Sequence, residues 1–393
     1  MADRLLPPAD WTLRADLAAL VAALGPGNAR YVGGAVRDTL LGIEVKDIDL
    51  ATPLLPPEVI SRLDAAAIRS VPTGIEHGTV TAILPGGPVE ITTLRHDVST
   101  DGRRATIAFA NDWQDDAARR DFTINALYAD PETRTISDFF GGLADLSGRH
   151  VRFIGDARQR IREDHLRIMR YFRFQARFGS QPANPEAEEA CAELAATLKG
   201  LSRERIAMEL LNLLSLADPA PAITRMAQLG VLPVILPEAD PAVLAALIAE
   251  ERRQGVSPDP LRRLAALLPA DPPLVDAVGA RLRLSTAQRK RLASAAARSD
   301  APGDARVLAY RLGRAEASDR LLLAGSPVAP LAGWDIPRLP LKGGDIVARG
   351  IGAGPEVART LRALEERWIA EGFPDEARTR ELLDDLLRPE SAA

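Results

Sequence analysis

The chain has 393 residues, which is enough for two or three domains that each bury a core. Its formal net charge of −5 argues against nucleic-acid binding through a general excess of positive charge. A single cysteine excludes a disulfide framework and a cysteine zinc site. The sequence contains no run of about 18 apolar residues and no apparent secretory signal, so we expect a cytoplasmic protein with no membrane span.

Positive charge and aromatic residues concentrate in the middle of the chain. Between Arg149 and Arg177 there are nine arginines and three acidic residues, a local charge of +6. Eight of the nine phenylalanines lie between Phe109 and Phe178. The chain prefers Arg to Lys throughout, and this preference explains the residue type but not the clustering. A basic, aromatic-rich segment within an acidic chain indicates a confined site for a polyanion.

The first predicted element is an amphipathic helix over residues 11–24, which ends at Gly25-Pro26-Gly27. An apolar strand then leads into Gly33-Gly34, and a polar segment with Arg37 opens a short helix. Paired glycines let the backbone approach a ligand closely, and the amides at the start of a helix favour phosphate.

A second strand carries Asp47 and Asp49, one residue apart. Side chains alternate along a strand, so we expect both carboxylates on one face. Two such carboxylates repel unless a cation lies between them, and Mg²⁺ prefers oxygen ligands of this kind. Alone, a glycine pair is usually a turn and an Asp-x-Asp is usually a solvated loop. Their order and spacing together indicate a metal–nucleotide site.

A helix over residues 56–67 and strands over 79–84 and 89–95 are predicted next, with Pro72–Gly74 as a turn. Glu90 lies on the second of these strands. It is our candidate for a third carboxylate of a two-metal site, and an ordinary edge glutamate is an equally good interpretation. The polar segment 97–105 is either a mobile loop near the site or an exposed hairpin tip.

Charged residues gather again at Arg119-Arg120-Asp121, followed by Asn125. Planar guanidinium groups pair well with phosphate oxygens, and a carboxylate suits a ribose hydroxyl. An Arg-Arg pair alone is usually a surface feature.

The chain is predicted to be mainly helical from residue 140 onward. A short extended piece over 148–156 is expected to lead into one long helix over 157–178. Asp164 and Arg167 lie off its apolar stripe, three residues apart, and are therefore expected to be neighbours on the helix surface. Without other information, the simplest interpretation of Asp164 and Arg167 is an exposed ion pair on the helix surface. Another helix begins near Ser202, and helical hairpins separated by Pro and Gly follow from residue 219.

Three of these segments resemble the signature motifs of class II tRNA nucleotidyltransferases and bacterial poly(A) polymerases. The first is Gly33-Gly34-Ala35-Val36-Arg37-Asp38 with Asp47-Ile48-Asp49, and the second is Arg119-Arg120-Asp121 with Asn125. The third is Glu163-Asp164-His165-Leu166-Arg167, ahead of Arg170. The resemblance covers residues 30–212 by motif and the remainder by a looser pattern.

The resemblance implies an α+β head of the polymerase-β-like nucleotidyltransferase type, with a mixed sheet, over residues 1–139. An all-α neck for base recognition over 140–217 and an all-α body and tail for tRNA binding over 218–393 would follow. The segment from Ser202 to Glu209 resembles a further motif of the family that is mainly structural.

The same resemblance implies roles for individual residues. Asp47 and Asp49 would hold two Mg²⁺ ions, with Glu90 as the candidate third ligand. The implied nucleotide-binding residues are Gly33, Gly34, Arg37, Arg119, Arg120, Asp121, Asn125, Asp164, Arg167 and Arg170. Within this set, Asp121 and Asn125 would hold the ribose, while Asp164 and Arg167 would read the edge of the base.

The implied activity is the addition of CCA to the 3′ end of tRNA from CTP and ATP, with no stable protein partner evident. A poly(A) polymerase is the alternative in the same fold, but such enzymes carry a Gly-Arg-Arg-Phe element after the acidic strand, where this chain has Ser70–Gly74. An enzyme that adds only CC or only A remains open. The alternative from another class is a non-catalytic RNA-binding protein.

Overall fold

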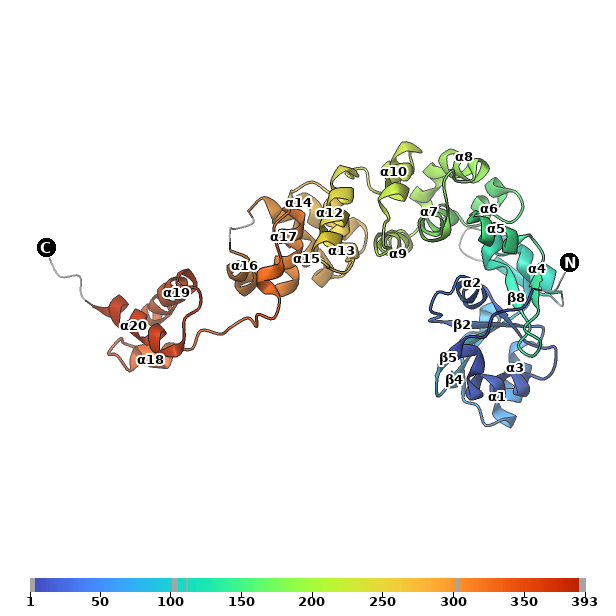
Figure 1. Ribbon diagram of the computed structural model, residues 1–393, viewed down its shortest axis with the longest axis horizontal. Coiled ribbons are helices and arrows are strands. Elements are labelled where there is room, and N and C mark those ends of the chain that lie inside the picture. Colours follow the sequence, from blue (N-terminus) through green and yellow to red (C-terminus); the bar gives the residue numbers. More distant parts are fainter. Residues whose placement is uncertain (1–3, 101–104, 111, 301–303, 389–393) are drawn as a thin grey trace. The chain divides into compact units, whose positions relative to one another are not determined.

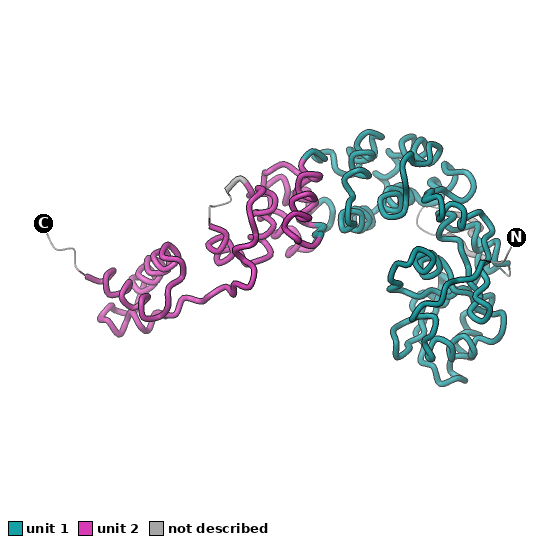
Figure 2. The backbone as a smooth tube through the Cα atoms, viewed as in Figure 1, with its two compact units in different colours: residues 1–242, 258–260, 281–284 teal, residues 243–257, 261–280, 285–393 magenta. Residues whose placement is uncertain are grey.

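A computed structural model describes residues 4–100, 105–110, 112–300 and 304–388. The chain divides into two compact units (Figure 2). The first comprises residues 1–242, 258–260 and 281–284, and the second comprises 243–257, 261–280 and 285–393. The predicted boundaries at residues 139 and 217 both fall inside the first unit, and the three-part division stays a prediction.

A seven-stranded mixed sheet forms the centre of the amino-terminal part, in the order β3-β4-β5-β2-β1-β8-β9 (Figure 1). Strands β2 and β5 run parallel, and the other neighbouring strands run antiparallel. The predicted mixed sheet is thereby confirmed. The strands are β1 (Arg30–Val32), β2 (Ile48–Thr52), β3 (Ser70–Gly74), β4 (Thr79–Leu84), β5 (Gly87–Thr93), β8 (Leu127–Ala129) and β9 (Ile136–Asp138).

Two helices cover the outer strands of this sheet, α1 (Ala15–Leu24) and α3 (Pro56–Ala65), and both contact β4 (Figure 1). Leu17 and Leu20 of α1 and Leu63 of α3 are fully buried, as expected for the apolar faces of amphipathic helices. The predicted helices at 11–24 and 56–67 are therefore confirmed, except that a separate 3-10 turn (Asp10–Leu13) precedes α1.

Two segments differ from the sequence-based prediction in this region. The predicted turn at Pro72–Gly74 is the end of strand β3, which pairs with β4. Of the polar segment 97–105, predicted as a mobile loop or a hairpin tip, residues 97–100 and 105 lie in the antiparallel strands β6 (Arg95–Thr100) and β7 (Ala105–Phe109). Residues 101–104 lie outside the described residues.

Helices make up the rest of the first unit. Of these, α7 packs against α9, and the pair borders the site described below. The helices are α2 (Gly34–Leu40), α4 (Trp113–Ala118), α5 (Gly142–Gly148), α6 (Ala157–Glu163), α7 (Arg167–Phe178), α8 (Pro185–Glu193), α9 (Arg203–Leu214), α10 (Ala220–Gln228) and α11 (Leu232–Ile235).

The prediction of one continuous helix over 157–178 is wrong. Helix α6 ends at Glu163, and Asp164 follows it in an extended conformation, with φ −148° and ψ 104°. The side chain of Asp164 accepts a hydrogen bond from the Leu166 amide, at 3.1 Å. Short polar side chains that bond to nearby backbone amides compete with helix formation, and this competition interrupts the helix before α7 begins.

The second unit is helical in its described part. Buried alanines and leucines form one cluster around α16 and α17, and buried leucines with Ile346 form another among α18, α19 and α20. None of the described helices combines the length and apolar character needed to cross a membrane. The predicted cytoplasmic location stays a prediction. The helices are α12 (Ala242–Arg253), α13 (Pro260–Leu267), α14 (Pro272–Arg281), α15 (Thr286–Ala296), α16 (Ala305–Leu312), α17 (Arg314–Leu323), α18 (Gly343–Val347), α19 (Pro355–Ala370) and α20 (Glu376–Leu387).

Candidate active site

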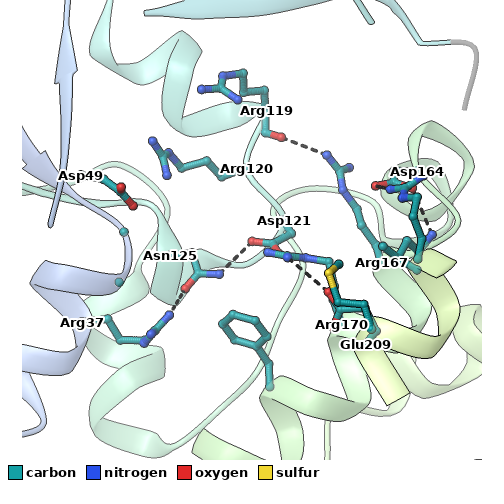
Figure 3. Close-up of a pocket in the computed structure, with 16 residues that line it drawn as sticks. Arg37, Asp49, Arg119, Arg120, Asp121, Asn125, Asp164, Arg167, Arg170 and Glu209 are labelled. Atoms are coloured by element: carbon teal, nitrogen blue, oxygen red, sulfur yellow. Dashed lines mark hydrogen bonds and ion pairs between the residues drawn. The ribbon is translucent and has the colours of Figure 1, made fainter. Parts of the chain in front are cut away.

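A pocket of about 580 Å³ lies within the first unit, between the start of α2, strand β2, the segment after α4, and helices α7 and α9 (Figure 3). This volume lies in the range of pockets that bind small molecules. Every predicted nucleotide-binding residue lines it. The lining comprises Gly33, Gly34, Arg37, Asp49, Arg119, Arg120, Asp121, Asn125, Asp164, Leu166, Arg167, Arg170, Phe174, Arg205, Met208 and Glu209.

Gly33 lets the side chain of Arg120 approach the backbone at the start of α2. Gly33 has a φ of +69°, a conformation that L side chains rarely adopt. A Cβ at Gly33 would lie 3.3 Å from Nη1 of Arg120, closer than most real contacts. The glycine is thus required both by its conformation and by the proximity of Arg120 to the start of α2.

Asp49 stands beside a second acid on the neighbouring strand. It lies in β2 directly opposite Glu90 of β5 in the parallel register. The pKa of Asp49 is raised to about 6, mainly by burial and also by the negative charges of Glu90 and Asp47. The positive charge of Arg120 lowers this pKa and offsets part of the shift. Asp47 is exposed and precedes β2, and neither Asp47 nor Glu90 lines the pocket.

These carboxylates suit a divalent cation. Within the described residues, no three His, Cys, Asp or Glu side chains are gathered as a metal cluster. Mg²⁺ in nucleotide sites usually takes one or two carboxylates and completes its shell with substrate phosphates and water. The negative charge that raises the pKa of Asp49 is the charge that such an ion would neutralise. The residues therefore fit Mg²⁺, and their roles as ligands stay a prediction.

Asp49→Asn should stabilise the metal-free protein at alkaline pH. Because folding raises the pKa of Asp49 from its usual 3.8 to about 6, the ionised carboxylate costs stability, and the cost develops as the pH rises between these values. We expect the free energy of unfolding of the variant to exceed that of the wild type by about 1–3 kcal/mol at pH 8 and to match it near pH 4.

Urea unfolding in EDTA at both pH values measures this difference. Asp64→Asn, an exposed change on α3, is the control and should have no effect at either pH. Equal stabilisation by Asp49→Asn at pH 4 and pH 8 would contradict the assigned shift.

A buried aspartate holds the two consecutive arginines. Asp116 of α4 is 1% exposed and accepts hydrogen bonds from Nε of Arg119 at 2.8 Å and from the Tyr128 hydroxyl at 2.6 Å. Its other arginine contact is with Nη2 of Arg120 at 3.3 Å. Burial pushes the pKa of Asp116 up, but the charges of Arg120 and Arg119 outweigh it and lower the pKa overall. Asp116 therefore fixes where both guanidinium groups can meet a ligand.

A chain of polar contacts joins four residues that line the pocket, from Arg37 through Asn125 and Asp121 to Arg170 (Figure 3). Arg37 donates to the side-chain oxygen of Asn125, whose amide nitrogen donates to Asp121 at 2.9 Å. The other oxygen of Asp121 accepts from Nε of Arg170 at 2.8 Å. Burial raises the pKa of Asp121, but the charge of Arg170 and these hydrogen bonds lower it overall. The contacts join α2 to α7 through the segment that carries Asp121 and Asn125.

Asp164 and Arg167 both reach the pocket, but they are not the surface ion pair that an unbroken helix predicts. Arg167 donates from Nη1 to Glu163 at 2.7 Å and from Nη2 to the carbonyl of Arg119 at 3.1 Å. Asp164 instead contacts Arg205 of α9. The break after α6 turns the two side chains toward different partners.

Helix α9 contributes pocket residues from a segment that was predicted to be mainly structural. Arg205, Met208 and Glu209 line the cavity, together with Leu166 and Phe174. Glu209 is 2% exposed and accepts from Nε of Arg173 at 2.7 Å. The signal for this was present in the sequence, since charged residues at 205 and 209 lie on one helix face.

Comparisons with known proteins find similar sequences and structures over most of the chain. The family model described as "Poly A polymerase head domain" matches residues 29–152, and that described as "Probable RNA and SrmB- binding site of polymerase A" matches residues 184–243. The chain is 37% identical over 363 residues to "CCA tRNA nucleotidyltransferase 1, mitochondrial" of Mus musculus, covering 88% of this chain and 83% of that protein.

Two bacterial proteins extend the comparison. A "CCA-adding enzyme" of Levilactobacillus brevis is 40% identical over 236 residues, which are 59% of this chain and 57% of that protein. Among solved structures, the Bacillus stearothermophilus CCA-adding enzyme in complex with CTP superposes with a TM-score of 0.72 at 27% identity. The superposition covers 94% of this chain and 96% of that one.

Proposed function

Because the chain belongs to the family of CCA tRNA nucleotidyltransferases and poly(A) polymerases, we propose that it adds C, C and A to the 3′ end of tRNA from CTP and ATP. The observation that carries the proposal is the similarity to a CCA tRNA nucleotidyltransferase over nearly the whole chain. The pocket that gathers residues from all three motifs supports it.

Selection of C and A follows from the hydrogen-bonding groups of Asp164 and Arg167. Cytosine and adenine both present an exocyclic amino donor beside a ring-nitrogen acceptor. A carboxylate accepts from the first, and a guanidinium donates to the second. Guanine and uracil present the opposite order, an oxygen acceptor beside an N–H donor, so both contacts fail. The protein thus needs no nucleic-acid template.

The guanidinium of Arg167 lines the pocket and is held by three hydrogen bonds. A guanidinium has five N–H donors. Three are used in the hydrogen bonds to Glu163, the Arg160 carbonyl and the Arg119 carbonyl. Among the contacts of the described residues, Nε and one hydrogen of Nη2 are left for a base. Because the engaged donors fix the plane of the group, Arg167 is oriented before the nucleotide binds.

The triphosphate is assigned to the arginines on the other side of the pocket. Arg119 and Arg120 are fixed by Asp116, and Arg120 lies near Gly33 and Asp49. Asp121 and Asn125 are assigned to the ribose, and Arg170 orients Asp121. In this assignment the base lies toward α7 and α9, and the phosphates lie toward β2.

Asp47 and Asp49 would hold Mg²⁺, and Glu90, opposite Asp49, is the further candidate ligand. When bound, Mg²⁺ supplies charge neutralisation at the phosphates and lowers the pKa of the attacking hydroxyl. The protein's own part is to bring the α-phosphate and the tRNA 3′-hydroxyl together in line, which is mainly positioning and electrostatics.

Three tRNA substrates test the proposal, ending at the discriminator base, at C and at CC. Each is incubated with CTP or ATP. A CCA-adding enzyme extends the first two with C and the third with A. Repeated A addition to any RNA end would identify a poly(A) polymerase instead. Binding of tRNA without incorporation would favour a non-catalytic RNA-binding protein, and activity on one of the two nucleotides alone would identify a partial enzyme.

The tail is expected to position tRNA. Its helices α18–α20 have their own buried cluster of Leu341, Ile346, Leu364, Leu382 and Leu383, and every pocket residue precedes residue 210. Removing residues from 341 onward should weaken binding of full-length tRNA about tenfold or more and change addition to a saturating acceptor-stem minihelix little.

Filter binding and single-turnover extension on both substrates measure the two effects. Circular dichroism and a melting curve of the truncated protein control for folding. Equal losses on tRNA and minihelix would show that the tail serves folding rather than tRNA positioning.

A further inference from the structure

Arg205 of α9 forms an ion pair with the carboxylate of Asp164, which is labelled in Figure 3. Nη2 of Arg205 lies 3.0 Å from Oδ1 and 2.9 Å from Oδ2 of Asp164. Oδ1 also accepts from the Leu166 amide at 3.1 Å. Both side chains are about one-third exposed and line the pocket, so the contact stands at the pocket wall rather than in the core.

These contacts use most of the acceptor capacity of Asp164. An ionised carboxylate offers about four lone-pair directions. Oδ1 uses two, for Leu166 and Arg205, and Oδ2 uses one, for Arg205. A single acceptor direction on Oδ2 is left open among the described contacts. One open acceptor is what a single exocyclic amino group requires.

Arg205 stands on a rigid support. Ser202 caps the start of its helix, because the Ser202 hydroxyl accepts a hydrogen bond from the Arg205 amide. Ile206, which follows Arg205, is fully buried. One turn later, Glu209 is fixed by Arg173. Without Arg205, the Asp164 carboxylate would keep the Leu166 contact alone and could rotate, because it lies in an extended linker between two helices.

We propose that Arg205 is a positioning residue for base selection: it orients Asp164 so that one oxygen accepts the amino group of cytosine or adenine. The proposal rests on the proposed function, in which Asp164 reads the base. It gives each base-reading side chain a separate partner, Glu163 for Arg167 and Arg205 for Asp164. Base selection therefore depends on α9 as well as on the motif that precedes α7.

Arg205→Ala tests this role through selectivity. Single-turnover incorporation of CTP, ATP, UTP and GTP into tRNA lacking its terminal residues gives the preference for C and A over U and G. Loss of a charged hydrogen bond that orients Asp164 should lower this preference about 10- to 100-fold. Arg205→Lys should recover most of the preference, because one nitrogen makes both contacts and an ammonium group can replace it.

A double-mutant cycle shows whether Arg205 acts through Asp164. In an Asp164→Ala background, Arg205→Ala should change the preference by no more than about twofold, since its partner is gone. Arg203→Ala, two residues earlier on α9 and outside the pocket lining, is the control and should behave as wild type. Melting curves establish that all variants fold.

Wild-type preference in Arg205→Ala, or additive losses in the double mutant, would overturn the proposal. So would a failure of Arg205→Lys to exceed Arg205→Ala, since that would indicate a role for the whole guanidinium rather than for one contact. These outcomes presuppose an active wild type. An inactive wild type on all three tRNA ends would instead overturn the proposed function, so the two failures are distinct.

Discussion

Replacing Arg167 by alanine should remove the selective incorporation of both CTP and ATP together. The guanidinium supplies the donor to the ring nitrogen of either base, so neither nucleotide can compensate for its loss. Sites built on hydrogen bonds discriminate by about 10⁴–10⁵ when a partner is left unpaired, against about 10–200 for a change of shape in an apolar pocket. Asp164→Ala should likewise lose the amino contact, and both variants should narrow the gap to UTP and GTP.

Single-turnover incorporation of all four nucleotides by each variant measures the effect. Arg167 also binds Glu163 and the Arg119 carbonyl, so its removal loosens the link between α7 and the segment that carries Arg120. Asp164→Ala leaves that link in place and separates base selection from this second effect. Arg162→Ala, an exposed change on α6, is the matched control. An unaltered preference order at wild-type rates would refute the base-reading role.

Asp49→Ala should reduce incorporation to below about 1% of the wild-type rate while leaving tRNA affinity nearly unchanged. Asp49 is the pocket-lining carboxylate of the acidic pair, and removal of one group that stabilises transition-state charge commonly costs about 10²–10³ in turnover. Asp47→Ala should have a similar effect, although its side chain is exposed in this structure, because a metal held by both residues loses affinity when either is removed.

Turnover at saturating CTP and Mg²⁺, together with filter binding of tRNA, separates catalysis from substrate binding. Asp64→Ala on α3 is the control for removing a carboxylate from the same domain. Variants of Asp47 and Asp49 that keep more than a few per cent of wild-type turnover would contradict their assignment as metal ligands. Loss of tRNA binding in parallel with turnover would point to a folding defect.

Glu90 was predicted as a third metal ligand or, equally, as an ordinary edge glutamate. The parallel pairing of β2 with β5 sets Glu90 opposite Asp49, and its charge contributes to the raised pKa of Asp49. The sequence could not supply this relation, because strand register joins residues 41 positions apart through backbone hydrogen bonds rather than through local pattern. The ligand role of Glu90 stays a prediction.

The sequence by itself determined the residues of the pocket that belong to contiguous motifs. Gly33-Gly34, Arg119-Arg120-Asp121 and the segment from Glu163 to Arg167 each carry their chemistry within a few residues, so their resemblance to family motifs can be recognised from the sequence. Most strands and helices were also predictable, since alternation and helical periodicity are local properties of the chain, whereas the mixed sheet was implied by the family resemblance. All of the predicted nucleotide-binding residues line one cavity.

Only the tertiary structure decided which partner each of these side chains meets. Asp164 pairs with Arg205 rather than standing beside Arg167, because the helix breaks at Asp164 and α9 packs against α7. Asp121 of the second motif likewise meets Arg170 of α7, which lies 49 positions later in the chain. Such contacts depend on the packing of distant segments, and local patterns in a sequence carry no record of which distant segments will meet.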